Sequence, residues 1–186
     1  MKLGFYGGSF NPPHEGHQYI IEYCNKKFDK FLVIPNNNSP DLNKDILAPF
    51  QHRYNMLQLQ LRKENVEIDD YEINSNQTNF TYLTIQYLMK KYNEYEIFMV
   101  LGQDQLSNLH NWYKIDFILK HTQIICFERK MKLKDLNIPL NVKLINFDFP
   151  FSSSYIRERI QMNKSIDSNI INKEVLNYIK ENKLYI

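Results

Sequence analysis

Residues 7–17 read Gly-Gly-Ser-Phe-Asn-Pro-Pro-His-Glu-Gly-His and directly follow the apolar run Leu3-Gly4-Phe5-Tyr6. The chain has only five glycines, and three of them lie within residues 7–17. A glycine pair lets the backbone pass close to a ligand, and a helix start offers unpaired N–H groups at the positive end of its dipole. This stretch therefore predicts a strand, a close turn and a helix start that together suit a phosphate group.

The rest of the chain alternates short apolar runs with segments of helical period, which is typical of βαβ units and a parallel sheet. Residues 36–49 are rich in Asn and Pro and are predicted to form an irregular loop. We predict one doubly wound, Rossmann-like α/β domain over residues 1–186, with a central parallel sheet, a helical C-terminal segment and its ligand at the carboxyl ends of the strands. Strands are expected at 3–6, 31–34, 66–68, 97–101 and 122–127, and helices at 15–28, 51–63, 85–92, 152–161 and 171–179.

The composition is that of a globular protein, with 43% hydrophobic and 24% charged residues. A formal net charge of +2 gives no global electrostatic reason to expect nucleic acid or a membrane surface as a partner. Cys24 and Cys126 are the only cysteines, so we expect no disulfide framework and interpret both as inert packing residues. No charged-then-apolar signal segment and no apolar run of about 20 residues is found, so we expect a cytoplasmic protein. A homo-oligomer stays open.

The two imidazoles of His14-Glu15-Gly16-His17 are three residues apart at a predicted helix start, so both can face one ligand above the first strand. Gly16 is interpreted as keeping that surface free of a side chain. A zinc pair would prefer histidines four residues apart, or further Cys and His ligands nearby. Two incidental histidines are the other alternative, and the preceding Gly-Gly-Ser-Phe favours a pair that orients phosphate.

Clustered hydroxyls in Ser152-Ser153-Ser154 precede another predicted helix and can supply both a cap and phosphate hydrogen bonds. Arg157 follows Ser153 by one helical turn, so its guanidinium can reach an anion held at the same helix start. An ordinary serine cap followed by a solvated basic helix is the alternative.

The third segment, Leu101-Gly102-Gln103-Asp104, ends the most apolar predicted strand. Asp104 either caps the next helix or contacts a ribose or a metal–phosphate group. Trp112 is the only tryptophan. It is either a core residue or an aromatic platform beside a nucleotide.

Together, these segments resemble the motifs of the nicotinate/nicotinamide mononucleotide adenylyltransferases, within the nucleotidyltransferase superfamily that carries a His-x-Gly-His motif. Residues 7–17 look like the first motif of that family, residues 151–157 like its Ile-Ser-Ser-Thr-x-Ile-Arg motif, and residues 101–112 like its Leu-Gly-x-Asp…Trp segment. Motif order and separation are similar to those of the bacterial nicotinate-type members. Phe151 replaces Ile and Ser154 replaces Thr, and both changes keep the size class or the hydroxyl.

The resemblance implies attack by the phosphate of nicotinate mononucleotide on the α-phosphorus of ATP, which yields nicotinate adenine dinucleotide and pyrophosphate, with Mg²⁺ accompanying the ATP. It implies catalytic roles for His14, His17 and Arg157. The implied ATP-binding residues are Gly7, Gly8, Ser9, Phe10, His14, His17, Gly102, Asp104, Arg129, Ser152, Ser153 and Arg157. The implied mononucleotide-binding residues are Gly8, Ser9, Lys44, Thr81, Trp112 and Tyr113. No residue is assigned to a protein-bound metal.

Three other functions are alternatives to this one. Lys130-Met131-Lys132-Leu133-Lys134 looks like the Lys-Met-Ser-Lys-Ser loop of class I aminoacyl-tRNA synthetases, but it lacks the serine, and 186 residues leave no room for a tRNA-reading domain. A related transferase could prefer nicotinamide mononucleotide, pantetheine phosphate or a cytidine nucleotide. Gly7-Gly8 and Trp112 favour a pyridine nucleotide. A nucleotide sensor without turnover is disfavoured by the intact His14 and His17.

Overall fold

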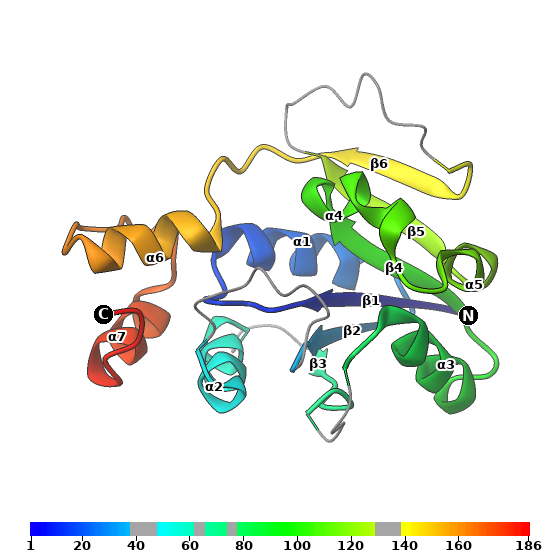
Figure 1. The fold of residues 1–186 in the computed structure, drawn as a ribbon, viewed down its shortest axis with the longest axis horizontal. Coiled ribbons are helices and arrows are strands. Elements are labelled where there is room, and N and C mark those ends of the chain that lie inside the picture. The colour runs from blue at the N-terminus through cyan, green and yellow to red at the C-terminus, as the bar shows by residue number, and fades with distance from the viewer. Residues whose placement is uncertain (38–47, 62–65, 74–77, 129–138) are drawn as a thin grey trace.

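In the computed structural model, which describes residues 1–37, 48–61, 66–73, 78–128 and 139–186, six parallel strands form one sheet in the order β3-β2-β1-β4-β5-β6 (Figure 1). The strands are β1 (Lys2–Gly8), β2 (Lys30–Pro35), β3 (Glu67–Ile68), β4 (Glu96–Gly102), β5 (Gln123–Glu128) and β6 (Val142–Asn146). The helices are α1 (Glu15–Asn25), α2 (Phe50–Gln60), α3 (Thr81–Lys91), α4 (Gln103–Ser107), the 3₁₀ helix η1 (Leu109–Asn111), α5 (Ile115–His121), α6 (Ser153–Gln161) and α7 (Lys173–Glu181).

Successive side chains of β1 point to opposite layers, as the pleat of a strand requires. Phe5 packs in one core cluster with Leu88 of α3 and Ile118 of α5, whereas Tyr6 packs in another with Ile21 of α1 and Leu57 of α2. Helices therefore cover both faces of the sheet, which confirms the predicted doubly wound α/β fold.

A third core cluster joins the C-terminal helices to α2 through Met56, Ile156, Val175 and Ile179. Figure 1 shows α6 and α7 beyond the end of the sheet at which β1 terminates. The neighbouring central strands β1 and β4 end there at Gly8 and Gly102, where the strand order reverses direction. This switch point is where an open α/β sheet binds its ligand.

The five expected strands all occur, each with its ends within two residues of the expected positions. The helix expected to reach Phe28 ends at Asn25, and the Phe28 ring instead packs beside Phe31 and Phe98. Strand β6 was not predicted, since this edge strand has half-buried and exposed residues without a clean alternation. The helix expected directly after Gly102 occurs as α4, whereas η1 and α5 were not predicted.

Both cysteines are buried, and burial raises the pKa of each thiol to about 12, which confirms their interpretation as packing residues. Across the described part of the chain, no helix is long and apolar enough to cross a membrane.

Candidate functional site

The start of α1 is capped by two histidines that bond to each other's backbone. His14 occupies the N-cap, and its Nδ1 accepts a hydrogen bond from the Gly16 N–H at 3.1 Å. The Nδ1 of His17 in turn accepts a hydrogen bond from the His14 N–H at 3.2 Å. The two rings stack with centroids 3.7 Å apart and planes 26° apart. A reciprocal capping box, usually built by Ser or Thr with Glu, is thus built here by imidazoles.

This cap determines which nitrogen of each ring carries the proton. Because Nδ1 of His14 and Nδ1 of His17 both accept from a backbone N–H, the proton of each neutral ring lies on Nε2. An imidazole in this tautomer is a hydrogen-bond donor at Nε2, which suits a phosphate oxygen. His14 is only 4% exposed, and His17 is half-buried. The predicted pairing of the two rings is confirmed, while their contact with ATP stays a prediction.

The ring of Phe149 covers the other face of His14, with centroids 5.2 Å apart and planes 14° apart. A Cβ on Gly16 would lie 2.5 Å from Phe149 Cδ1 and 2.9 Å from His14 Cε1. The interpretation of Gly16 as a bare surface is therefore wrong, because Phe149 fills that space. The available signal was the aromatic residue at every second position in Phe147, Phe149 and Phe151.

The serine-rich segment bonds directly to the loop that precedes α1. Ser152 caps α6 by accepting from the Tyr155 N–H at 3.2 Å, as expected for a serine cap. Ser153 Oγ donates to the Pro12 carbonyl at 2.9 Å, and Arg157 Nη1 donates to the Asn11 carbonyl at 2.8 Å. Arg157 is thus brought to the first motif, some 140 residues away in the chain, at the carboxyl end of β1.

The first motif also contains a buried, left-handed residue. Phe10 has a φ of +47° and is 2% exposed, and its ring packs edge-on against Tyr6 and His17. A Cβ on Gly8 would lie 3.2 Å from that ring. The buried Phe10 ring therefore packs against the His17 ring, so any contact of Phe10 with ATP would come from its backbone.

At the end of β4, Gly102 forms the N-cap of α4 without a side-chain cap, and Asp104 lies exposed in the first turn. The alternative in which Asp104 caps this helix is therefore wrong. A Cβ on Gly102 would meet no atom of the described residues within 4 Å, so among these residues the strand end borders open space at the switch point. The predicted ribose contacts of Gly102 and Asp104 fit that space and stay predictions.

Tertiary contacts bring together the three residues predicted to bind the mononucleotide ring. Thr81 is the first residue of α3, and the Phe80 ring before it lies 5.0 Å from the Tyr113 ring. Tyr82, on the other side of Thr81, lies 5.5 Å from the same ring. Trp112 precedes Tyr113 at the end of η1 and is half-buried. Both the aromatic-platform and the core interpretation of Trp112 fit this partial burial.

Arg53 is a buried residue of this region that the sequence analysis missed. It is 2% exposed, and its guanidinium donates to the carbonyls of Ala48, Ser9 and Asn36 at 2.7–2.9 Å. It therefore ties the loop after β1 to the end of β2. The available signal was its helical spacing with Met56 and Leu57, which places an arginine on the apolar face of α2.

Glu72 is a buried residue whose carboxyl group contacts α3. Its Oε1 accepts from Thr84 Oγ1 at 2.8 Å, one helical turn after Thr81. Burial raises the pKa of Glu72 to about 7, although the Thr84 hydrogen bond, a backbone bond from Asn37 and the charge of Arg53 act in the opposite direction. The predicted contacts of Lys44 and Arg129 lie outside the described residues.

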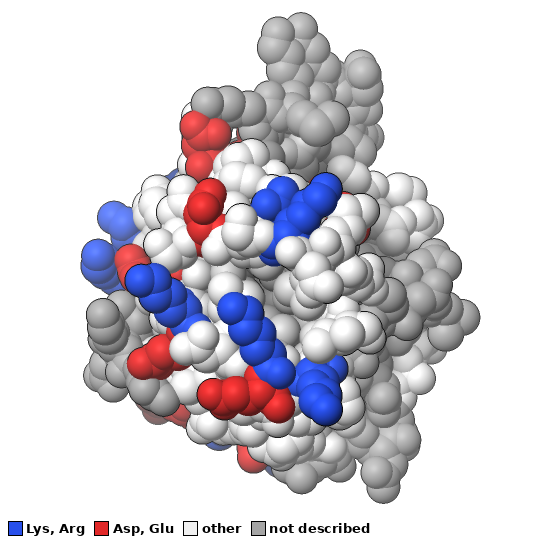
Figure 2. Space-filling model, turned by 90° about the vertical axis from the view of Figure 1, so that its left-hand side faces the viewer, with Lys and Arg blue, Asp and Glu red and all other residues white. Residues whose placement is uncertain are grey.

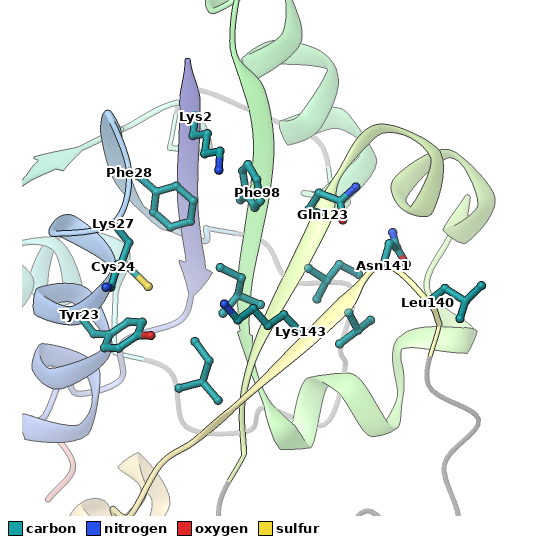
Figure 3. Close-up of a pocket in the computed structure, with 14 residues that line it drawn as sticks. Lys2, Tyr23, Cys24, Lys27, Phe28, Phe98, Gln123, Leu140, Asn141 and Lys143 are labelled. Atoms are coloured by element: carbon teal, nitrogen blue, oxygen red, sulfur yellow. The ribbon is translucent and has the colours of Figure 1, made fainter.

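A cavity of about 420 Å³ opens at the other end of the sheet, between the end of α1 and the amino ends of the strands (Figure 3). Lys2, Phe98, Gln123 and Lys143 contribute to its walls. None of the predicted site residues that the structure describes lines it. The candidate site is instead formed by the loop of residues 8–14, the end of β4 and the start of α6, at the carboxyl ends of the strands.

Figure 2 shows the end of the molecule that carries α6 and α7, where Lys and Arg side chains lie among Asp and Glu. No field of a single sign extends over the described surface in that view. An anion would therefore be bound by local donors, namely the start of α6 and the Arg157 guanidinium.

Comparison with known proteins identifies the family of the chain and similar folds. The model of the cytidylyltransferase-like family matches residues 5–159. Probable nicotinate-nucleotide adenylyltransferases of Caldicellulosiruptor saccharolyticus and Leptospira interrogans are 31% and 33% identical to the chain, and each alignment covers 100% of this chain and 99% or 97% of the relative. The structure of Plasmodium falciparum nicotinic acid mononucleotide adenylyltransferase complexed with NaAD is similar in fold, with a TM-score of 0.83 and 21% identity over 99% of this chain and 97% of that one.

Proposed function

The chain belongs to the cytidylyltransferase-like family and, within it, to the nicotinate-nucleotide adenylyltransferases, and we therefore propose that it transfers the AMP moiety of ATP to nicotinate mononucleotide. A phosphate oxygen of the mononucleotide attacks the α-phosphorus, and the bond from that phosphorus to the β-phosphate oxygen breaks. The products are nicotinate adenine dinucleotide, an intermediate of NAD biosynthesis, and pyrophosphate. The proposal depends most on one observation, the contact of Arg157 with the loop that leads into the histidine pair.

Such a transfer needs positioning and charge stabilisation more than covalent help from the protein. His14 and His17 present Nε2 donors to the phosphates, and His17 lies nearest to the transferred group. Arg157 and the backbone N–H of Ser153 bind the leaving β- and γ-phosphates at the start of α6, because the Ser153 hydroxyl already donates to the Pro12 carbonyl. The negative charge that develops on the leaving pyrophosphate is thus met by a guanidinium and by helix N–H groups.

Mg²⁺ enters this reaction as part of the substrate, MgATP. Mg²⁺ keeps several waters and is commonly bound through one or two carboxylates together with substrate phosphates. In the described ranges of the chain, no group of three or more His, Cys, Asp and Glu side chains is placed to hold a metal ion. The exposed carboxylate of Asp104, at the end of β4, fits a role as an outer contact to the metal–phosphate group or the ribose.

The acceptor site is formed by the start of α3 and the segment after η1. Trp112 stacks on the pyridine ring, which is common to the acid and the amide. Selectivity for the carboxylate then comes from N–H donors near Thr81 and Tyr113. The proximity of the Phe80 and Tyr113 rings supports one binding site built from both segments.

Pyrophosphate release with MgATP and a panel of acceptors tests the proposal. We expect the highest kcat/KM with nicotinate mononucleotide and a lower value with nicotinamide mononucleotide. A higher kcat/KM with the amide would overturn the choice of acceptor while keeping the transferase. Preference for pantetheine phosphate, or no pyrophosphate release with any acceptor, would overturn the proposed activity.

A further inference from the structure

The C-terminal end of the chain contacts the first motif. The hydroxyl of Tyr185, the penultimate residue, donates to Asn11 Oδ1 at 2.7 Å, across 174 residues of sequence. Tyr185 is 7% exposed and Asn11 is 4% exposed, so this hydrogen bond is shielded from water. A buried hydrogen bond of this length contributes to the position of both groups, because breaking it would leave a polar atom without water.

Asn11 connects that contact to the proposed phosphate site. Its Oδ1 also accepts from the Ala48 N–H at 3.0 Å, and its main-chain carbonyl accepts from Arg157 Nη1 at 2.8 Å. One residue thus receives a donor from the C-terminal turn, a donor from the segment before α2 and the guanidinium of α6. A shift of Asn11 would move the acceptor that orients Arg157.

The C-terminal turn is itself firmly placed. Leu184 and Tyr185 are buried in the cluster that joins α2, α6 and α7, and the Leu184 N–H donates to the Ile179 carbonyl at 3.0 Å. Tyr185 has a left-handed φ of +64°, a conformation that a non-glycine residue keeps only where its surroundings impose it. Burial raises the pKa of Tyr185, so its hydroxyl remains a donor at neutral pH.

We propose that Tyr185 is a positioning residue of the adenylyl-transfer site, which acts through Asn11 on Arg157 and on the loop of residues 8–14. This inference rests on the proposed function. Removing the hydroxyl would leave the Asn11 side chain with one donor fewer and loosen the acceptor of Arg157. Since a misplacement of about 1 Å can cost on the order of 100-fold in rate, we expect Tyr185→Phe to lower kcat about 10-fold, with a small change in the KM for the mononucleotide.

Tyr178→Phe is the matched control, because it removes a hydroxyl from the same C-terminal segment at a different contact. The Tyr178 hydroxyl bonds His52 and Asn55 of α2 at 3.0 and 2.9 Å. We expect both variants to fold with similar melting temperatures and Tyr178→Phe to keep the native kcat. Equal kcat in the two variants would overturn the inference.

Two further measurements separate positioning from general destabilisation. In an Asn11→Ala background, adding Tyr185→Phe should have little further effect on kcat, because the connecting residue is already lost. Full additivity would contradict the route through Asn11.

Hydrogen–deuterium exchange at the Ala48 amide should rise in Tyr185→Phe and not in Tyr178→Phe. This exchange needs no turnover, so it tests the link from Tyr185 through Asn11 to Ala48 even if the wild type proves inactive on nicotinate mononucleotide and the proposed function fails.

Discussion

The imidazoles of His14 and His17 stack 3.7 Å apart, and each ring uses its Nδ1 to accept a backbone N–H at the start of α1. The two nitrogens of each ring therefore serve different purposes. Nδ1 satisfies donors that a helix start would otherwise leave unpaired. Nε2 is the protonated nitrogen of each neutral ring, so the helix cap determines which atom would donate in the proposed contact with phosphate.

His17→Ala should lower kcat on the order of 100- to 1000-fold, the usual cost of removing one donor to a developing negative charge. The affinity for ATP should change much less, because the contact strengthens in the transition state. Steady-state kinetics with both substrates varied would measure this split. Thermal unfolding should show a loss of only about 1 kcal/mol from the cap. A folded variant with the native kcat would remove His17 from the catalytic assignment.

Arg157→Lys should also damage turnover, although it keeps the positive charge. The guanidinium spans two acceptors, the Asn11 carbonyl and Ser154 Oγ, and an ammonium group cannot reproduce that fork. Arg159→Lys is the matched control on the same helix, because the Arg159 guanidinium donates to the Ser165 carbonyl, away from the first motif. We expect a loss of at least about 10-fold in kcat/KM for ATP at position 157 and none at 159. Similar values for the two variants would reassign Arg157 to a solvated role.

Gly16→Ala should lower the stability of the protein, whereas Gly102→Ala should mainly raise the KM for ATP. A Cβ at Gly16 would collide with Phe149 and His14, so we expect a stability loss of about 1–3 kcal/mol. A Cβ at Gly102 would meet none of the described atoms within 4 Å, so stability should change by less than about 0.5 kcal/mol. If ATP passes over Gly102 as proposed, its KM should nevertheless rise in Gly102→Ala. An unchanged KM there would place the adenosine elsewhere.

Trp112→Ala should weaken nicotinate and nicotinamide mononucleotides by a similar factor, about 1–3 kcal/mol if stacking of nucleic-acid bases is a fair guide. Both ligands carry the same ring, so the acid-over-amide ratio should survive. Isothermal titration with each mononucleotide measures the ratio directly. Loss of selectivity with retained affinity would show that Trp112 sets the discrimination.

Glu72 should make stability depend on pH. Its pKa of about 7 in the folded protein lies above the ordinary value of 4.5, so the folded state binds this proton more tightly than the unfolded chain does. The contribution is fully present below about pH 4.5 and is lost as the pH rises through about 7. Since one pKa unit corresponds to about 1.4 kcal/mol, the effect is about 3 kcal/mol.

Glu72→Gln keeps an acceptor for Thr84 and cannot ionise. Between pH 5 and pH 8, the melting temperature of the wild type should fall relative to that of the variant. Parallel curves for the two proteins over that range would show that Glu72 ionises without cost in the folded state.

Local pattern was enough to predict most of the fold. Continuous apolar runs such as that of β4 and glycines at strand ends depend on neighbours within a few residues, so they can be recognised in the sequence. The serine cap of α6 and the pairing of His14 with His17 were predicted for the same reason. Strand β6 was missed because an edge strand is half-exposed on both faces and lacks a clear period.

Contacts between distant segments were decided by the tertiary structure. Phe149 lies over His14, Arg53 bonds the carbonyls of Ser9 and Asn36, and Tyr185 bonds Asn11. In the sequence these are an ordinary phenylalanine, an ordinary helix arginine and a tyrosine near the chain end. Their roles arise only after the sheet and helices have packed, because the burial and partners of a polar group depend on residues that may be more than 100 positions away.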